Sequence, residues 1–232
     1  MNKKQAKEIL DKIIKQIFGR DNPFTLEEAL SKFAFDISLP QKVYDSETNE
    51  VTWAMSTSPT KFMKFSNISK RSLVDNWEMP KKPVKGLQEV LEAWNQINYM
   101  ATERAMDATG VLECDSVTKI ENVFRSQDCG ESKNILFCDG IYKSEFVAAS
   151  QRSITLNFCM RAEDSRNSSN SFGIIWSGKI SDSFFIQDCY DMQDCMFCSH
   201  MVSKQYCIAN MQFEKDEYMK IRKEVIDWIL SK

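Results

Sequence analysis

The feature that most constrains the fold is a regular recurrence of short strand-like pieces between Glu121 and Asn210. Each piece opens with a polar or small residue, usually Ser or Asn, and continues into branched and aromatic residues. Most pieces start 9 to 12 positions after the previous one, and a single interval of 18 contains the polar insertion 162–170. Their first residues are Asn122, Asn134, Ser144, Ser153, Ser171, Ser183, Cys195 and Tyr206. Spacing of this kind is typical of stacked β-coils.

The recurrence predicts a parallel β-solenoid, or β-helix. We expect two pieces per coil, which gives coils of about 20 to 24 residues, within the usual period of solenoids. An antiparallel β-sandwich also has strands every 8 to 12 residues or so, and is the alternative. We prefer the solenoid because stacked coils place like residues above one another, whereas a sandwich does not need the same polar residue in register.

Helices are predicted on both sides of this region. Residues 3–18 carry apolar side chains at spacings of three and four, and Gly19 follows as a stop. Thr25 and Glu28 have the form of a capping box, which predicts a second helix to about Phe33. The segment 214–230 has a similar apolar pattern and predicts a C-terminal helix, which we expect to cap the end of the stack.

The part between the first helices and the coils is more varied. Residues 42–57 are typical of a hairpin with a polar turn, and the proline- and lysine-rich segment 58–83 predicts an irregular connection. Residues 86–108 predict a long helix. The expected class is therefore α+β, with a mostly helical region over 1–112, a solenoid over 113–212 and a helix over 213–232.

Composition excludes some classes of protein. The 232 residues carry a net charge of −3, which argues against general binding to nucleic acid or to anionic membranes. No apolar run is long enough to cross a bilayer, and the N-terminal pattern is too interrupted for a secretory leader. We therefore expect a cytoplasmic protein whose eight cysteines are mainly reduced core residues.

One cysteine cluster is a candidate metal site. Zinc prefers thiolate and imidazole ligands in tetrahedral sets, and iron also takes thiolates. Only one Cys-x-x-Cys pair is present, however, and in alternating strands Cys195 and Cys198 would point to opposite faces. The candidate ligands are Cys189, Cys195, Cys198, His200 and Cys207.

Other polar and aromatic groups have both a functional and a simpler interpretation. Asp188, Asp191 and Asp194 could bind calcium, although solvated loop carboxylates are the commoner explanation for such residues. Arg152, Arg161 and Arg166 could face an anionic ligand, or could form salt bridges with the nearby acidic residues. A stacking platform for a sugar or base is conceivable, although core packing is the simpler interpretation for its residues, which are Trp176, Phe184, Phe185 and Phe197.

Several motifs resemble those of uncharacterised Ser/Asn/Cys-rich β-solenoid proteins of candidate-phyla-radiation bacteria. The motifs are residues 132–138, 170–178, 188–191, 195–200 and 204–210, with residues 49–53 in the N-terminal part. The resemblance implies no catalytic residues. Some of these proteins carry a zinc-ribbon-like segment that this chain lacks, which weakens a metal role by analogy. The order helix, β-helix, helix also resembles scaffold proteins of iron–sulfur cluster assembly, at the level of fold alone.

These observations predict a non-catalytic structural or interaction scaffold that binds a protein partner or a second copy of itself. The alternative is a thiol-dependent metal or iron–sulfur-related protein that uses the Cys189–Cys207 cluster, with zinc or iron bound. A carbohydrate-active β-helix enzyme is a third possibility, but it would need carboxylates gathered in an exposed cleft.

Overall fold

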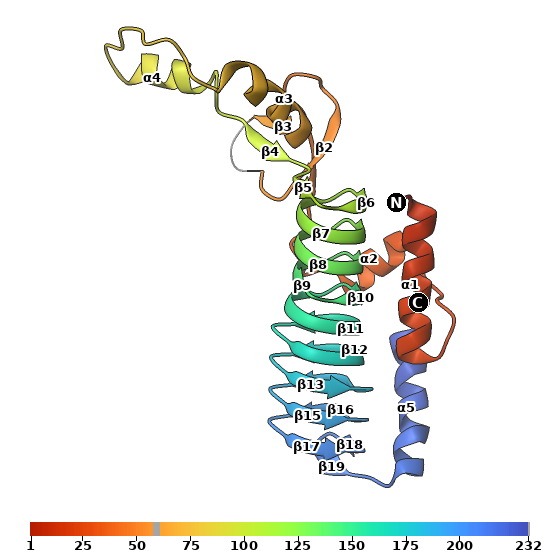
Figure 1. Ribbon diagram of the computed structural model, residues 1–232. Helices are drawn as coiled ribbons and strands as arrows, with labels where there is room; N and C mark the ends of the chain where they lie inside the picture. The colour runs from red at the N-terminus through yellow and green to blue at the C-terminus, as the bar shows by residue number, and fades with distance from the viewer. Residues whose placement is uncertain (58–60, 232) are drawn as a thin grey trace.

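The computed structural model describes residues 1–57 and 61–231 and contains a parallel β-solenoid with helices along one side (Figure 1). This confirms the predicted fold class. The solenoid strands are β5 (Ala105–Met106), β6 (Thr109–Leu112), β7 (Asp115–Phe124), β8 (Gln127–Leu136), β9 (Asp139–Tyr142), β10 (Glu145–Ala148), β11 (Gln151–Glu163), β12 (Arg166–Ile175), β13 (Gly178–Ser181), β14 (Phe184–Gln187), β15 (Tyr190–Gln193), β16 (Met196–Ser199), β17 (Val202–Gln205), β18 (Cys207–Ile208) and β19 (Met211–Gln212).

The remaining elements precede or follow the solenoid. They are α1 (Lys3–Phe18), α2 (Leu26–Phe33), β1 (Gln41–Tyr44), β2 (Val51–Ala54), β3 (Phe62–Lys64), α3 (Phe65–Asp75), α4 (Leu87–Trp94), β4 (Met100–Thr102) and α5 (Lys215–Ile229).

One turn of the solenoid contains twelve residues. Asp115 pairs with Gln127, Glu145 with Asn157 and Phe184 with Met196, each twelve positions apart. The predicted coil of 20 to 24 residues is therefore wrong, because each recurring piece belongs to a whole turn rather than to half of one.

The turn is short because the backbone bends at every third residue. From Cys114 to Cys198 every third side chain is buried, and the residue two positions after each of them has a positive φ. Twelve residues therefore contain four bends, and the coil has four sides. The left-handed conformation costs a non-glycine residue about 1–2 kcal/mol, so hydrogen bonds and packing between turns must offset many such residues.

Serine hydroxyls satisfy the backbone inside the coil. Ser126 Oγ donates to the carbonyl of Phe124 at 2.9 Å and accepts from the N–H of Cys138 at 3.0 Å. Both bonds recur at Ser132, Ser144, Ser150, Ser153, Ser165, Ser168, Ser171, Ser177 and Ser183. A serine is therefore as suitable as a small apolar residue at a buried position inside the coil, because its hydroxyl group is hydrogen-bonded.

A second core lies between one side of the solenoid and the helices. The solenoid contributes a column of buried side chains spaced by twelve residues, namely Phe124, Leu136, Ala148, Met160, Phe172, Phe184, Met196 and Ile208. Leu10, Ile13 and Ile14 of α1 and Tyr218 and Ile226 of α5 belong to the same core. Figure 1 shows α1 and α5 lying lengthwise along this side rather than across the ends of the stack. The helices predicted over 3–18, 25–33 and 214–230 are confirmed.

Two predictions for the N-terminal part are wrong, although the hairpin is confirmed by the antiparallel pair β1 and β2. The helix expected over 86–108 ends at Trp94, and Met100–Thr102 instead pairs in parallel with Phe62–Lys64. The connection expected over 58–83 contains β3 and α3, apart from residues 58–60, which lie outside the described residues.

The two ends of the solenoid are closed in different ways. At the first turns, the buried carboxylate of Asp115 accepts from the Arg104 guanidinium and from the N–H of Met55, which joins the hairpin region to the coil. At the last turn, Lys204 occupies a position that holds a buried, inward-facing side chain in the earlier turns. In addition, β19 folds back and pairs antiparallel with β18. A charged residue at an inward position is a known way to stop further strand addition.

Candidate functional site

The predicted metal ligands come together only in part, because Cys198 and Cys207 each interact with Cys195 inside the coil whereas His200 lies outside it. All eight cysteines are free and buried, and Cys189, Cys195, Cys198 and Cys207 lie inside the coil. The left-handed bend at Phe197 turns Cys195 and Cys198 to the same interior, unlike the opposite faces expected of a flat strand. The side chain of His200 is 75% exposed on the outside. Within residues 1–57 and 61–231 no group of three or more His, Cys, Asp or Glu could hold a metal ion.

The thiols are protonated at neutral pH in most of the coil. Burial raises the pKa of Cys114, Cys138 and Cys159 to about 12. Cys195 and Cys198 hydrogen-bond to each other, which raises the pKa of Cys195, as burial also does, and lowers the pKa of Cys198 to about 6. A thiol with a raised pKa is a poor nucleophile, because the thiolate is the reactive form.

The three aspartates considered as calcium ligands are held apart. Asp188, Asp191 and Asp194 occupy three successive left-handed bends, with φ of 49°, 59° and 45°, so they project from different corners of one turn. Aspartate tolerates this conformation better than most residues. Asp188 instead faces His200 of the next turn, with 3.7 Å between Oδ2 and Nε2.

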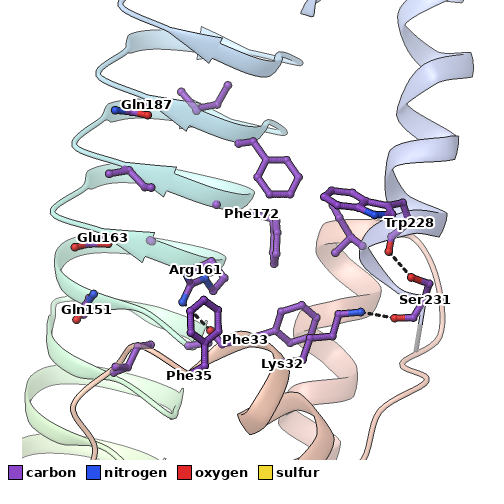
Figure 2. A pocket seen from close by; sticks show the side chains of 18 residues that line it. Lys32, Phe33, Phe35, Gln151, Arg161, Glu163, Phe172, Gln187, Trp228 and Ser231 are labelled. Carbon is purple, nitrogen blue, oxygen red and sulfur yellow. Dashed lines mark hydrogen bonds between the residues drawn. The ribbon is translucent and has the colours of Figure 1, made fainter. Parts of the chain in front are cut away.

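A cavity lies where the helices meet the solenoid. It has a volume of about 500 Å³ and is lined by the end of α2, the end of α5 and strands β11, β12 and β14. Its lining includes Gln151, Glu163, Ile175 and Gln187, which form a column with a spacing of twelve residues on the outside of the coil. Figure 2 shows these strands on one side of the cavity and the two helix ends on the other.

Aromatic side chains form a continuous wall of this cavity. The Phe172 ring lies 5.7 Å from Phe33 and 5.3 Å from Phe185, and Phe185 lies 5.7 Å from Trp228, measured between ring centroids. Phe35 and Trp228 approach the opening from different sides in Figure 2 and are 72% and 61% exposed. The opening is therefore edged by two large apolar side chains that remain in contact with water.

The charged groups around the cavity are paired. The Arg161 guanidinium donates to both oxygens of Asp36 and to the carbonyl of Phe33, and this lowers the pKa of Asp36. Lys32 donates to the carbonyl of Ser231, and Glu163 accepts from Arg152. Salt bridges, the simpler interpretation of the arginines, thus hold for Arg152 and Arg161.

A second candidate site projects from the first turns of the solenoid. We call residues 65–98 the arm, which contains α3 and α4 (Figure 1). Neither helix has a buried residue. Leu87, Val90, Leu91 and Trp94 of α4 follow the spacing of a single helical face, and all four are exposed.

Sequence reasoning found part of these sites. Leu87, Val90, Leu91 and Trp94 belong to the predicted helical pattern, but nothing in that pattern indicates that they stay uncovered. Of the proposed stacking platform, Phe185 lines the cavity, whereas Phe184 is buried in the core and Trp176 does not line this cavity. Phe35 and Trp228 were missed, because only the folded chain brings them together.

Comparison with protein-family models, with curated proteins and with solved structures returned no match. Across the described part of the chain, no helix is long and apolar enough to span a membrane.

Proposed function

We propose that this protein is a non-catalytic interaction scaffold of the cytoplasm, which presents the arm to a protein partner. The observation that carries the proposal is the exposed apolar face of α4, formed by Leu87, Val90, Leu91 and Trp94. Anchors at positions i, i+3, i+4 and i+7 are the pattern by which an amphipathic helix enters a groove of another protein. The reduced thiols agree with a cytoplasmic setting.

The short length of α4 favours a bound partner, because a helix of this length is only marginally stable when nothing covers it. Isolated helices shorter than about 12–15 residues are marginal in water, and α4 has eight residues, none of them buried. A partner that covers the apolar face would therefore stabilise both the helix and the complex.

Two other occupants fit the apolar face less well. Two copies of α4, each about 12 Å long, would bury much less than the roughly 1,200 Å² of a stable interface if they paired with each other. A membrane surface is disfavoured because Glu89 and Glu92 lie on the polar face, where lysine and arginine are expected of helices that bind anionic lipid.

Photo-cross-linking in the cell that makes the protein tests this proposal. A photoreactive phenylalanine analogue replaces Trp94 on the apolar face or, as a matched control, Glu92 on the opposite face. We expect a discrete adduct with another protein from position 94, little from position 92, and loss of the adduct when Leu87→Ser and Leu91→Ser are added. An adduct of two copies of this chain, or equal cross-linking from both positions, would contradict the proposal.

A further inference from the structure

We propose that the cavity between α2, α5 and the solenoid binds an uncharged small molecule with an aromatic body. The site is separate from the arm and does not depend on the function proposed above. Its volume of about 500 Å³ lies in the range of small-molecule sites, which are mainly apolar with few polar groups.

The aromatic side chains that line the cavity favour a ligand with a flat aromatic ring system. Phe33, Phe172, Phe185 and Trp228 form a run of rings with centroids 5.3–5.7 Å apart. A flat aromatic ligand can extend this run, since ring pairs attract in offset and edge-to-face arrangements. It would also cover Phe35 and Trp228, whose exposure to water is unfavourable at about 25 cal/mol per Å².

The charged side chains around the cavity favour a ligand without a net charge. Arg161 is engaged with Asp36, and Glu163 is engaged with Arg152. Arg161 and Lys32 also donate to carbonyls at the ends of α2 and α5, where the helix dipoles are negative. Because Lys32, Arg161 and Glu163 each already have a hydrogen-bond partner in the protein, a ligand with a net charge would have to displace one of these partners to gain a counter-ion.

The column of Gln151 and Gln187 provides polar contacts for an uncharged group. Both residues line the cavity and belong to one column on the outside of the coil, and Figure 2 shows Glu163 between them. A primary amide offers both donors and an acceptor. A ligand with a single amine, hydroxyl or carbonyl group could hydrogen-bond there while its rings pack on the aromatic wall.

Two fluorescent probes with the same ring system test the proposal. N-phenyl-1-naphthylamine is uncharged, and 8-anilinonaphthalene-1-sulfonate adds a sulfonate. We expect the first probe to bind the full chain saturably, with one molecule per protein, and at least tenfold more tightly than the sulfonate. Absence of saturable binding, or tighter binding of the sulfonate, would overturn the proposal.

Matched tryptophan variants locate the probe. Trp228→Ala removes one wall of the cavity, and we expect it to weaken binding of the uncharged probe at least tenfold. Trp94→Ala in the arm and Trp176→Ala on the solenoid change tryptophans that are also exposed but lie away from the cavity, and they should leave binding unchanged. Thermal unfolding of each variant verifies the fold. A loss with Trp94→Ala instead of Trp228→Ala would show that the probe binds the arm.

Discussion

At the residue scale, the twelve-residue turn depends on side chains that satisfy the backbone from inside the coil. Ser165 Oγ donates to the carbonyl of Glu163 at 2.8 Å and accepts from the N–H of Ser177 at 3.2 Å. Ser165→Ala leaves this buried N–H without its acceptor, so we expect a loss of about 1–3 kcal/mol in the free energy of unfolding, measured by denaturant titration.

Ser165→Cys is the matched control. A sulfur can occupy the same role, since Cys189 Sγ donates to the carbonyl of Gln187 and accepts from the N–H of Met201. The cysteine variant should therefore lose less stability than the alanine variant. Equal losses would show that the hydroxyl bonds contribute little.

The buried thiols give stability a dependence on alkaline pH. The pKa of Cys159 is about 12 in the folded protein and about 9 in the ordinary thiol, so the folded state retains the proton more strongly. Stability is full below about pH 9 and should decline as the pH rises toward 12. Cys159→Ser removes one titrating group and should make the decline shallower, by up to about 1.4 kcal/mol per pH unit, in unfolding titrations at several pH values. An unchanged slope would contradict the raised pKa.

The same residues explain why the period of three is hard to recognise in the sequence. Inward positions hold Ser, Cys, Val and Ile alike, so hydropathy does not alternate along the chain. The left-handed bends are occupied by residues such as Phe146, Lys179 and Trp176 as well as by glycine, so turn signals are weak. The spacing of about twelve residues between the strand-like pieces is recognisable in the sequence, and it predicted the solenoid but not the length of its turn.

At the scale of elements, the helices divide into α1, α2 and α5, which pack on the solenoid, and α3 and α4 of the arm, which have no buried residue. Phe172 contacts Phe18 of α1 and Phe33 of α2, whereas Trp94 of α4 is 53% exposed. Phe172→Ala should reduce the free energy of unfolding by about 3–5 kcal/mol, and Trp94→Ala by less than about 0.5 kcal/mol. Both values come from denaturant titration, and a large loss with Trp94→Ala would mean that α4 packs on its own chain.

The helix predicted over residues 86–108 was too long, because its apolar spacing continues beyond the end of α4. Ile97, Ala101 and Ala105 continue the apolar spacing of α4, which led to a predicted helix as far as residue 108. In the structure Ala101 pairs with Met63, and Ala105 begins the solenoid by pairing with Val117. Tertiary pairing overrides helical periodicity here, because strand partners were available on both sides.

At the scale of the whole molecule, the solenoid and its helices form a continuous body, and the arm projects from its first turns (Figure 1). The cavity could not be predicted from the sequence, since its lining comes from three distant segments. Asp36 and Arg161, for example, lie 125 positions apart and meet beside it. A stacked body with an uncovered docking helix is the arrangement on which the proposed scaffold function depends.

Hydrogen exchange read by mass spectrometry tests this claim most directly, on the free protein and on its complex with the cross-linked partner. In the free protein we expect slow exchange across the solenoid, α1 and α5, and fast exchange across the arm. In the complex, new protection should appear at residues 87–94. Protection confined to the solenoid, with the arm still exchanging fast, would contradict the account.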